Sequence, residues 1–302
     1  MILGVLDFQT ISDAVGLGAI YALMAVGIGL VFGVLRLVNF AYGQLIMAGA
    51  YTLAYTSSWP VTYSILACFG VVIALSLAMD RVVFRPLRGQ TPAVMLVTTF
   101  AIAFLLQAIA QIIDLRDDQL GEVASSVSSL NEAITVGGVH IRKVAIVAVI
   151  VALVALALLA LLLTRTTIGL HTRAAASDFG TARLLGVRAN YVIAFAVLLS
   201  GVLAAAVAVL LTVQTPFVMP DFALRDTIVV LVGVVVGGID RLWTATLGGF
   251  AIGFTSVLIN GLLPTEKTVY LDSWLFGLVI LVLLLRPAGL FAWGRRAAGE
   301  RV

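Results

Sequence analysis

The chain has 302 residues, of which 62% are hydrophobic and only 11% are charged, and its mean hydropathy is +1.16. Soluble domains carry about 25% charged residues, so this composition excludes an ordinary soluble protein and predicts an integral membrane protein with short loops. The formal net charge is +3. In a soluble protein a basic balance would suggest a nucleic-acid partner, but here we interpret it as cationic loops on the cytoplasmic side and expect no nucleic acid.

Apolar runs long enough to cross a hydrocarbon core of roughly 30 Å follow one another along nearly the whole chain, which leaves no room for a soluble domain. They do not alternate between polar and apolar residues, as the strands of a membrane barrel would. We therefore predict one all-α domain over residues 1–302, a polytopic transmembrane helical bundle of about 8–9 segments. In chain order these segments are 11–34, 40–55, 61–79, 92–113, 144–164, 191–213, 227–239, 243–263 and 273–285.

Three of the segments, 40–55, 227–239 and 273–285, are short for a full crossing and have glycines around their edges. Because non-helical backbone is tolerated at membrane depth only where protein or a water-filled cavity covers it, we predict broken or re-entrant helices there. The stretches LVNFAYGQLIMAGA and GGIDRLWTATLGG each place polar residues before a small-residue helix. This faint likeness predicts a duplicated element, which is typical of transporters.

The loops predict an orientation. Arginines gather in 81–88, 165–188 and 286–301, which the number of crossings places on one side, and that side is cytoplasmic by the positive-inside rule. The N-terminus and the extracytoplasmic loop 114–143 then lie outside, with most of the acids, and the C-terminus lies inside. An acidic outer face is compatible with docking a soluble partner, but acids also simply solvate loops. Within 114–143, the run ITVGGVHI predicts a hairpin around Gly137 and Gly138.

Catalytic motifs are missing from the sequence: it has no GxSxG, no HExxH and no paired carboxylates within a segment. Neither of its two lysines, Lys143 and Lys267, stands in a phosphate-binding loop. We therefore expect no enzyme activity and no cofactor in this chain, and any ATP must be hydrolysed on another subunit. His140 and His171 have no neighbours at ligand spacing, so no metal site is predicted. Cys68 lies within an apolar run and is expected to pack there.

The residues that interrupt the predicted segments are polar but uncharged. An ion-coupled carrier usually keeps charged residues in the middle of the membrane, so this pattern argues against one. The uncharged polar residues are Asn39 and Gln44 in the second segment, Thr98, Thr99 and Gln107 in the fourth, and Asn260 in the eighth. Such groups can bond a polar solute or join neighbouring helices, and the sequence leaves both uses open. Gln107 and Gln111 are one turn apart, and we expect their shared face to point into the bundle. The glycine pair Gly249 and Gly253 predicts a close helix contact.

The loop 165–190 differs from the rest because it is basic, rich in alanine and able to form only short amphipathic helices. Asp178 is placed to cap a helix, and Gly186 follows as its C-terminal stop. A face of small residues at three- and four-residue steps could seat in a groove on another protein. This face consists of Ala174, Asp178, Ala182 and Leu185. The alternative is an interfacial helix that lies on lipid headgroups.

Four blocks, at 16–51, 172–201, 236–253 and 281–294, resemble the permease subunits of branched-chain amino acid ABC transporters of the LivH kind. The resemblance implies a bacterial inner-membrane importer subunit that translocates branched-chain or related small amino acids. It also implies a second, LivM-like permease, two cytoplasmic ATPase subunits and an extracytoplasmic solute-binding protein as partners.

The resemblance also implies roles for particular residues. The coupling helix that seats in an ATPase groove would include Arg173, Ala174, Asp178, Ala182, Leu185 and Gly186. The translocation path would pass Asn39, Tyr42, Gly43 and Gln44, which match an Asn-Phe-Ala-x-Gly block of the family, and we add Thr98 and Gln107. The family more often has His where Tyr42 stands, and its Gly-Ser-x-x-Gly is replaced after Gly238. These departures leave a permease for urea or short amides as an alternative substrate class. Rivals from other functional classes are an ion-coupled secondary carrier and a passive channel or structural subunit.

Overall fold

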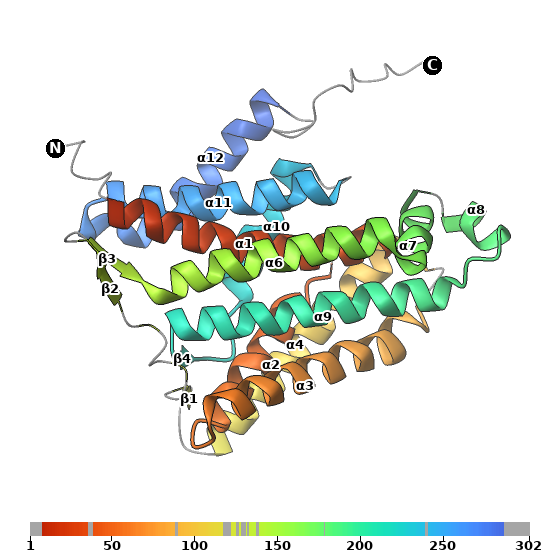
Figure 1. Cartoon of the computed structure of the whole chain (residues 1–302), viewed down its shortest axis with the longest axis horizontal. Helices are drawn as coiled ribbons and strands as arrows, with labels where there is room; N and C mark the ends of the chain where they lie inside the picture. Colours follow the sequence, from red (N-terminus) through yellow and green to blue (C-terminus); the bar gives the residue numbers. More distant parts are fainter. Residues whose placement is uncertain are drawn as a thin grey trace.

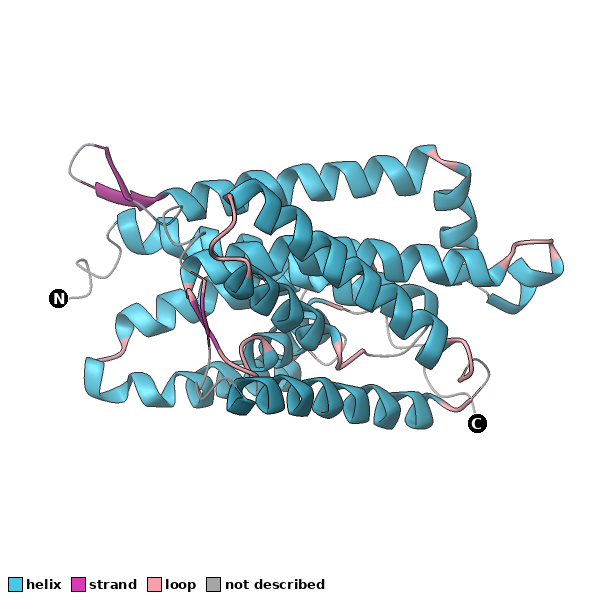
Figure 2. Cartoon of the chain, turned by 90° about the horizontal axis from the view of Figure 1, so that it is seen from below, coloured by secondary structure: helices cyan, strands magenta, loops and turns pink. Residues whose placement is uncertain are grey.

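A computed structural model of the chain (Figure 1) describes all residues except 1–7, 36–38, 88–89, 117–121, 125–126, 128–130, 132, 137–138, 178, 239–240 and 287–302. Helices make up most of the described chain, and the strands are short and lie at one end (Figure 2). Seven helices are long and apolar enough to cross a membrane. The prediction of an all-α transmembrane bundle is therefore confirmed.

The first half of the bundle holds α1 (Phe8–Leu35), α2 (Tyr42–Tyr55), α3 (Val61–Met79), its π-helical continuation (Asp80–Phe84) and α4 (Pro92–Arg116). Next come α6 (Lys143–Arg165), α7 (Thr167–Ser177) and α8 (Phe179–Leu184). The second half holds α9 (Ala189–Gln214), α10 (Leu224–Gly237), α11 (Leu242–Leu262), a 3-10 turn (Thr265–Tyr270) and α12 (Leu271–Leu285). Proline sits just before α3 and at the first position of α4, where its missing N–H and fixed φ suit a helix start.

Two antiparallel strand pairs close the end of the bundle where α1 begins. Strands β2 (Ala133–Val136) and β3 (Val139–Arg142) pair from Ala133 with Arg142 to Val136 with Val139. The predicted hairpin is thus confirmed, while Gly137 and Gly138 themselves lie outside the described residues. Strand β1 (Glu122–Val123) pairs with β4 (Phe217–Val218), which ties the loop after α4 to the loop after α9.

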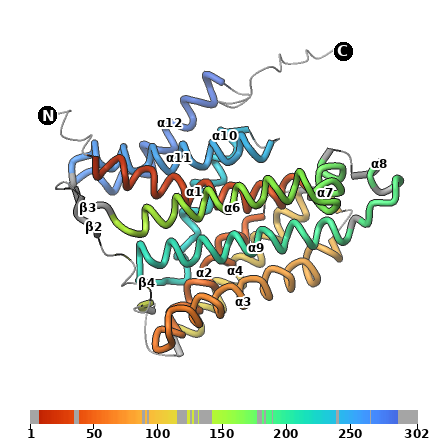
Figure 3. Tube along the Cα trace, in the orientation of Figure 1, coloured from red at the N-terminus to blue at the C-terminus, as the bar shows by residue number. Residues whose placement is uncertain are grey.

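The core is built around α1, which lies between α11, α9 and α6 (Figure 3). Glycines let α11 approach it closely. A Cβ added at Gly249 would lie 2.5 Å from Ala25 Cβ, and one added at Gly253 would lie 3.0 Å from Gly18 Cα. The close contact predicted from this glycine pair is therefore confirmed. In contrast, α4, α6 and α12 leave most of their membrane-crossing length exposed, so lipid or another chain must cover them.

The bundle consists of two halves that contain the same succession of long and short helices, and the helices of one half run in the opposite direction to those of the other. Each half has a long helix, a helix of 14 residues and two further long segments, namely α1 to α4 and α9 to α12. The contacts between helices repeat as well, with α9 as the counterpart of α1, α10 of α2 and α11 of α3. Helix α1 packs on α11, and its counterpart α9 packs on α3. Likewise α2 packs on α9, and its counterpart α10 packs on α1. Because α1 and α9 run in opposite directions (Figure 1), this is an inverted repeat, as many secondary transporters have.

Two details of the sequence prediction are wrong. The counterpart of α2 is α10, whereas GGIDRLWTATLGG, which the sequence likened to the start of α2, leads into α11. The last segment is also not short, because the 3-10 turn continues directly into α12 and together they give a span of 20 residues, Glu266–Leu285. Only α2 and α10 keep the predicted short length. A helix of 14 residues is about 21 Å long and cannot cross a core of roughly 30 Å.

Candidate translocation site

The short helices α2 and α10 meet at their first turns. Helix α2 starts from a turn at Asn39, whose Oδ1 accepts a hydrogen bond from the Ala41 N–H at 3.1 Å and whose carbonyl accepts one from the Tyr42 N–H. Helix α10 starts at Ala223, whose carbonyl accepts hydrogen bonds from the N–H and the hydroxyl of Thr227. From the meeting point, α2 runs toward the end where α1 begins, and α10 runs toward the other end (Figure 1).

Gly43 makes this meeting possible. A Cβ at this position would lie 2.5 Å from Thr227 Oγ1 and 3.0 Å from the Ala223 carbonyl oxygen. Real Cβ atoms do not approach other atoms so closely, so a larger residue would force the two first turns apart. Glycine is thus required here for close approach rather than for an unusual backbone angle.

A small cavity of about 30 Å³ lies between these first turns and the middle of α4. Its walls come from the start of α2 (Phe40 and Gln44), from α4 (Phe100, Ala103, Phe104 and Gln107) and from the start of α10 (Leu224, Thr227 and Ile228). The rings of Phe40 and Phe100 stack with their centroids 3.9 Å apart. None of the described residues that line this cavity carries a charge.

Gln44 is 1% exposed, and its Oε1 has no hydrogen-bond partner among the described residues. A buried polar atom without a partner costs about 1–3 kcal/mol. Most buried polar groups do have partners, so such an exception calls for an explanation. A ligand that donates a hydrogen bond to Gln44 in the cavity would supply one.

A larger cavity continues along the same two helices toward the strand-bearing end, with a volume of about 340 Å³ and an almost wholly apolar lining. From α2 it is lined by Met47, Ala48, Tyr51, Thr52, Tyr55 and Thr56, and from α4 by Leu106, Ile109, Ala110 and Ile113. The hydroxyl of Tyr51, one of these lining residues, donates a hydrogen bond of 2.7 Å to Asp114. We call the row of two cavities between α2 and α4 the α2–α4 seam.

The residues predicted for the translocation path do not all reach the seam. Gln44 and Gln107 line the small cavity together. Tyr42 is fully buried in the core, where its ring occupies the space left by Gly27 of α1. Thr98 lines neither cavity and donates a hydrogen bond to the Val94 carbonyl of its own helix. The Asn39 side chain accepts a backbone hydrogen bond in the turn from which α2 starts.

The expectation for Gln111 is wrong, because its side chain is exposed although Gln107, one turn earlier, is half-buried. The seam also includes residues that the sequence analysis missed, namely Phe40, Phe100 and Thr227. No local pattern identifies Thr227 as a partner of Gly43, since the two lie 184 positions apart.

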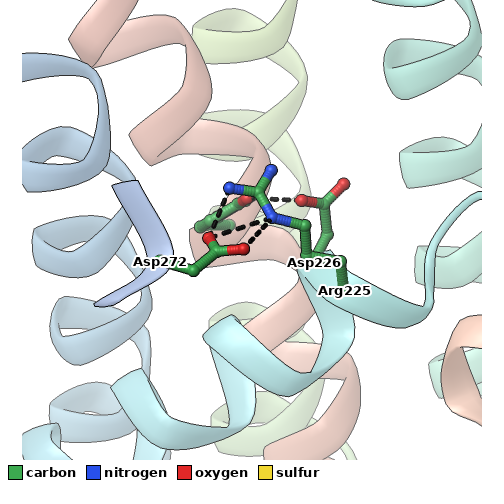
Figure 4. A network of polar contacts seen from close by, with 4 residues as sticks. Arg225, Asp226 and Asp272 are labelled. Atoms are coloured by element: carbon green, nitrogen blue, oxygen red, sulfur yellow. Dashed lines mark hydrogen bonds and ion pairs between the residues drawn. The ribbon is translucent and has the colours of Figure 1, made fainter. Parts of the chain in front are cut away.

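A polar network anchors the start of α10 to α1 and α12 (Figure 4). The Tyr21 hydroxyl donates a hydrogen bond of 2.6 Å to Asp226 Oδ1. Next to it, Arg225 Nε donates to both carboxylate oxygens of Asp272, at 3.0 and 2.9 Å. Asp226 precedes the segment 227–239 that was predicted from the sequence, but the structure places it in the first turn of α10 against buried Tyr21. The phenol and the neighbouring ion pair make this position tolerable for a carboxylate.

The loop 165–190 folds into two short helices, α7 and α8, at the end of the bundle opposite the strands (Figure 2). Gly186 ends α8 with a φ of +89°, and the Val187 N–H donates a hydrogen bond to the Ala182 carbonyl, as in a Schellman stop. The prediction of a glycine stop is confirmed. Helix α8 begins directly after Asp178, which itself lies outside the described residues.

The predicted small-residue face is not a single helix face. Ala174 belongs to α7, where it is half-buried, and Ala182 belongs to α8, where it is buried, because small side chains let these helices pack closely. Arg173 is exposed. The most exposed apolar side chains in the segment are those of Leu184, at 88%, and Leu185, at 81%.

The chain is similar to known proteins over nearly its whole length. Residues 10–285 match a family described as branched-chain amino acid transport system / permease component. The chain is 30% identical over 294 residues to the high-affinity branched-chain amino acid transport system permease protein BraD of Pseudomonas aeruginosa, covering 93% of this chain and 94% of that protein. It is 27% identical over 298 residues to LivH of Escherichia coli, with the same coverage. A probable LivH permease of Methanocaldococcus jannaschii is 25% identical over 288 residues, 89% of this chain and 87% of that protein.

Proposed function

Because this chain belongs to the family of branched-chain amino acid transport system permease components, we propose that it forms part of the membrane path of an ATP-driven importer for branched-chain or related small amino acids. It is a multi-pass membrane transport protein with seven helices long enough to cross the bilayer. The observation that carries the proposal is the family match over residues 10–285, which includes both halves of the inverted repeat.

The proposed path follows the α2–α4 seam. Its two cavities run from near Thr56, at the strand-bearing end, to the first turns of α2 and α10 in the middle of the bundle. Helix α4 also exposes large apolar side chains such as Val97, Phe104 and Ile112. A second, LivM-like permease that covers α4 would enclose the path, so we propose it as the partner at this face.

The proposed orientation places the N-terminus and the strands outside and α7, α8 and the C-terminus in the cytoplasm. Arg165, Arg173 and Arg188 lie at or beside α7 and α8, and Arg85 follows the π turn that packs on α9 nearby. This gathering of arginines at one end is what the positive-inside rule expects of the cytoplasmic side. The opposite end would receive substrate from an extracytoplasmic binding protein.

The proposed contact with the ATPase subunits is the segment 173–186. Leu184 and Leu185 are largely exposed at the end of the bundle, and no described part of this chain covers them. Arg173, in the same segment, is exposed as well. Two apolar side chains on a short helix suit an apolar groove on a partner. Asp178, Ala182 and Gly186 remain part of this proposed segment, in which Ala182 is buried and Gly186 ends α8, and we propose the two leucines as the side chains that dock.

Uptake by proteoliposomes tests this function. The unmodified chain is reconstituted with its permease and ATPase partners, the binding protein is added outside, and L-leucine and urea are supplied as labelled solutes. The proposal expects L-leucine to accumulate only when ATP is present on the ATPase side. Accumulation by this chain alone under an ion gradient would favour a secondary carrier, and import of urea without leucine would overturn the substrate.

A further inference from the structure

The small cavity between α2, α4 and α10 combines features that suit a ligand carrying both charges. Helix N-termini concentrate partial positive charge on unbonded N–H groups and favour anions. The N-cap residues of α2 and α10 are Ala41 and Ala223, whose own side chains make no cap hydrogen bond, and at the start of α2 the Asn39 Oδ1 accepts a hydrogen bond from the Ala41 N–H. The first turn of α2 also has no acidic residue. The N–H groups of Ala41, Tyr42 and Gln44 already have acceptors in this turn, so a carboxylate would be attracted to the start of α2 by the positive end of its helix dipole.

The opposite charge of the ligand has an acceptor in the same cavity. Gln44 Oε1 is buried and has no partner among the described residues, and Gln107 contributes a second amide from the facing wall on α4. An ammonium group has only donors, so it can satisfy such oxygens. Arg225 and Asp226, which follow the lining residue Leu224 in the first turn of α10, already have partners of their own: the Tyr21 hydroxyl donates to Asp226, and Arg225 donates to Asp272 (Figure 4).

Apolar and aromatic side chains make up the rest of the cavity. Phe40, Phe100 and Phe104 form one group, and Leu224 and Ile228 of α10 form the other. These walls suit an aliphatic side chain, whereas an isolated ion would lose its hydration without compensation. At about 30 Å³ the cavity has room for little more than water. Binding an amino acid therefore requires the helices around the cavity to move apart.

We propose that the cavity between the starts of α2 and α10 is an amino-acid binding site of the permease itself, in which Gln44 accepts a hydrogen bond from the α-ammonium, the start of α2 receives the carboxylate and the phenylalanines contact an aliphatic side chain. This inference rests on the proposed function and adds to it that the permease recognises the zwitterion, in addition to any selection by a binding protein.

A protection assay tests the site. Ile228→Cys is introduced together with Cys68→Ala, which removes the only native cysteine, and the complete transporter is placed in nanodiscs. Alkylation at position 228 is followed by mass spectrometry of this chain at increasing L-leucine. Because Ile228 lines the cavity and is partly exposed, bound leucine should slow the reaction. Two fragments of leucine, 4-methylpentanoate and 3-methylbutan-1-amine, should protect at least about tenfold more weakly because each leaves one polar partner unpaired.

Gln44→Met and Gln111→Met form the matched pair of variants. Gln44→Met keeps the length of the side chain but removes the acceptor, and we expect the leucine concentration for half-protection to rise at least about tenfold. Gln111→Met, on the exposed side of α4, should leave it unchanged. If both variants protect like the parent, or if the two fragments protect as well as leucine, the inference is wrong.

The labelled-uptake assay separates this inference from the proposed function. When the unmodified assembly imports L-leucine but leucine gives no protection at position 228, only the binding site is refuted. When the unmodified assembly does not import L-leucine, the proposed function falls, whatever the protection assay gives.

Discussion

Replacing Gly43 with alanine tests whether the meeting of the two half-helices is essential. The added methyl would lie 2.5 Å from Thr227 Oγ1, 3.2 Å from Thr227 Cβ and 3.0 Å from the Ala223 carbonyl oxygen. One of these neighbours is backbone, and the other is a β-branched side chain with few rotamers. The clash must therefore push α10 away from α2, by several tenths of an ångström or more.

The size of the effect follows from two opposing terms. Overpacking a close contact costs about 1–3 kcal/mol, whereas alanine gains at most about 1 kcal/mol over glycine in helix propensity. Because two of the contacts lie at or below 3.0 Å, the overpacking cost should fall in the upper part of its range, which leaves a net cost of about 1–2 kcal/mol. We expect Gly43→Ala to lower the unfolding free energy by this amount and to reduce L-leucine uptake about five- to thirtyfold, since about 1.4 kcal/mol at the site corresponds to a factor of ten.

The assay compares thermal unfolding in detergent with uptake in proteoliposomes for three variants. Gly70→Ala is the matched control, because its added methyl meets nothing within 4 Å, and it should be neutral or slightly stabilising. Gly43→Ala with Thr227→Ala should recover part of the loss, since the shortest contact is removed while the Ala223 oxygen remains. Parental uptake and stability in Gly43→Ala would refute the close contact between α2 and α10.

Two further predictions concern the polar network and the proposed docking segment. Tyr21→Phe removes the donor to Asp226 and should lower the free energy of unfolding by about 1–3 kcal/mol. Asp272→Asn breaks a partly exposed ion pair and should lower it by at most about 1 kcal/mol. Equal shifts in the unfolding curves of the two variants would contradict this ranking. Leu184→Asp with Leu185→Asp should leave the unfolding temperature of the isolated chain unchanged, because both side chains are exposed, yet abolish co-purification of the ATPase subunits and ATP-driven uptake. Retained co-purification and uptake would remove these leucines from the interface.

Helix positions could be predicted from the sequence because apolar runs have few alternatives in a bilayer. Lipid offers no hydrogen bonds, so each run must satisfy its backbone internally as a helix. The short length of α2 and α10 is visible in the sequence for the same reason. The start of α10 was missed by three residues because Arg225 and Asp226 resemble a loop, and only their contacts with Asp272 and Tyr21 make a helical position favourable.

The candidate site could be predicted only in part. Gln44 and Gln107 stand out as polar residues in apolar runs, but whether each faces a cavity or a neighbour depends on packing. Tyr42 illustrates the difference, since the gap at Gly27 on another helix draws its ring into the core. Likewise, the alanines of α7 and α8 matched a docking pattern, yet small side chains serve equally well to pack these helices onto the bundle.

Cysteine scanning along α2 tests most directly whether substrate passes along the α2–α4 seam. In a Cys68→Ala background, single cysteines replace Ala48 and Thr52, which line the seam, and Ala50 and Ala54, which are buried and line neither of its cavities. During ATP turnover, a water-soluble thiol reagent should modify the first pair and block L-leucine uptake, while the second pair should stay unmodified. Faster modification at Ala50→Cys and Ala54→Cys, or full uptake after modification at positions 48 and 52, would contradict the proposed path.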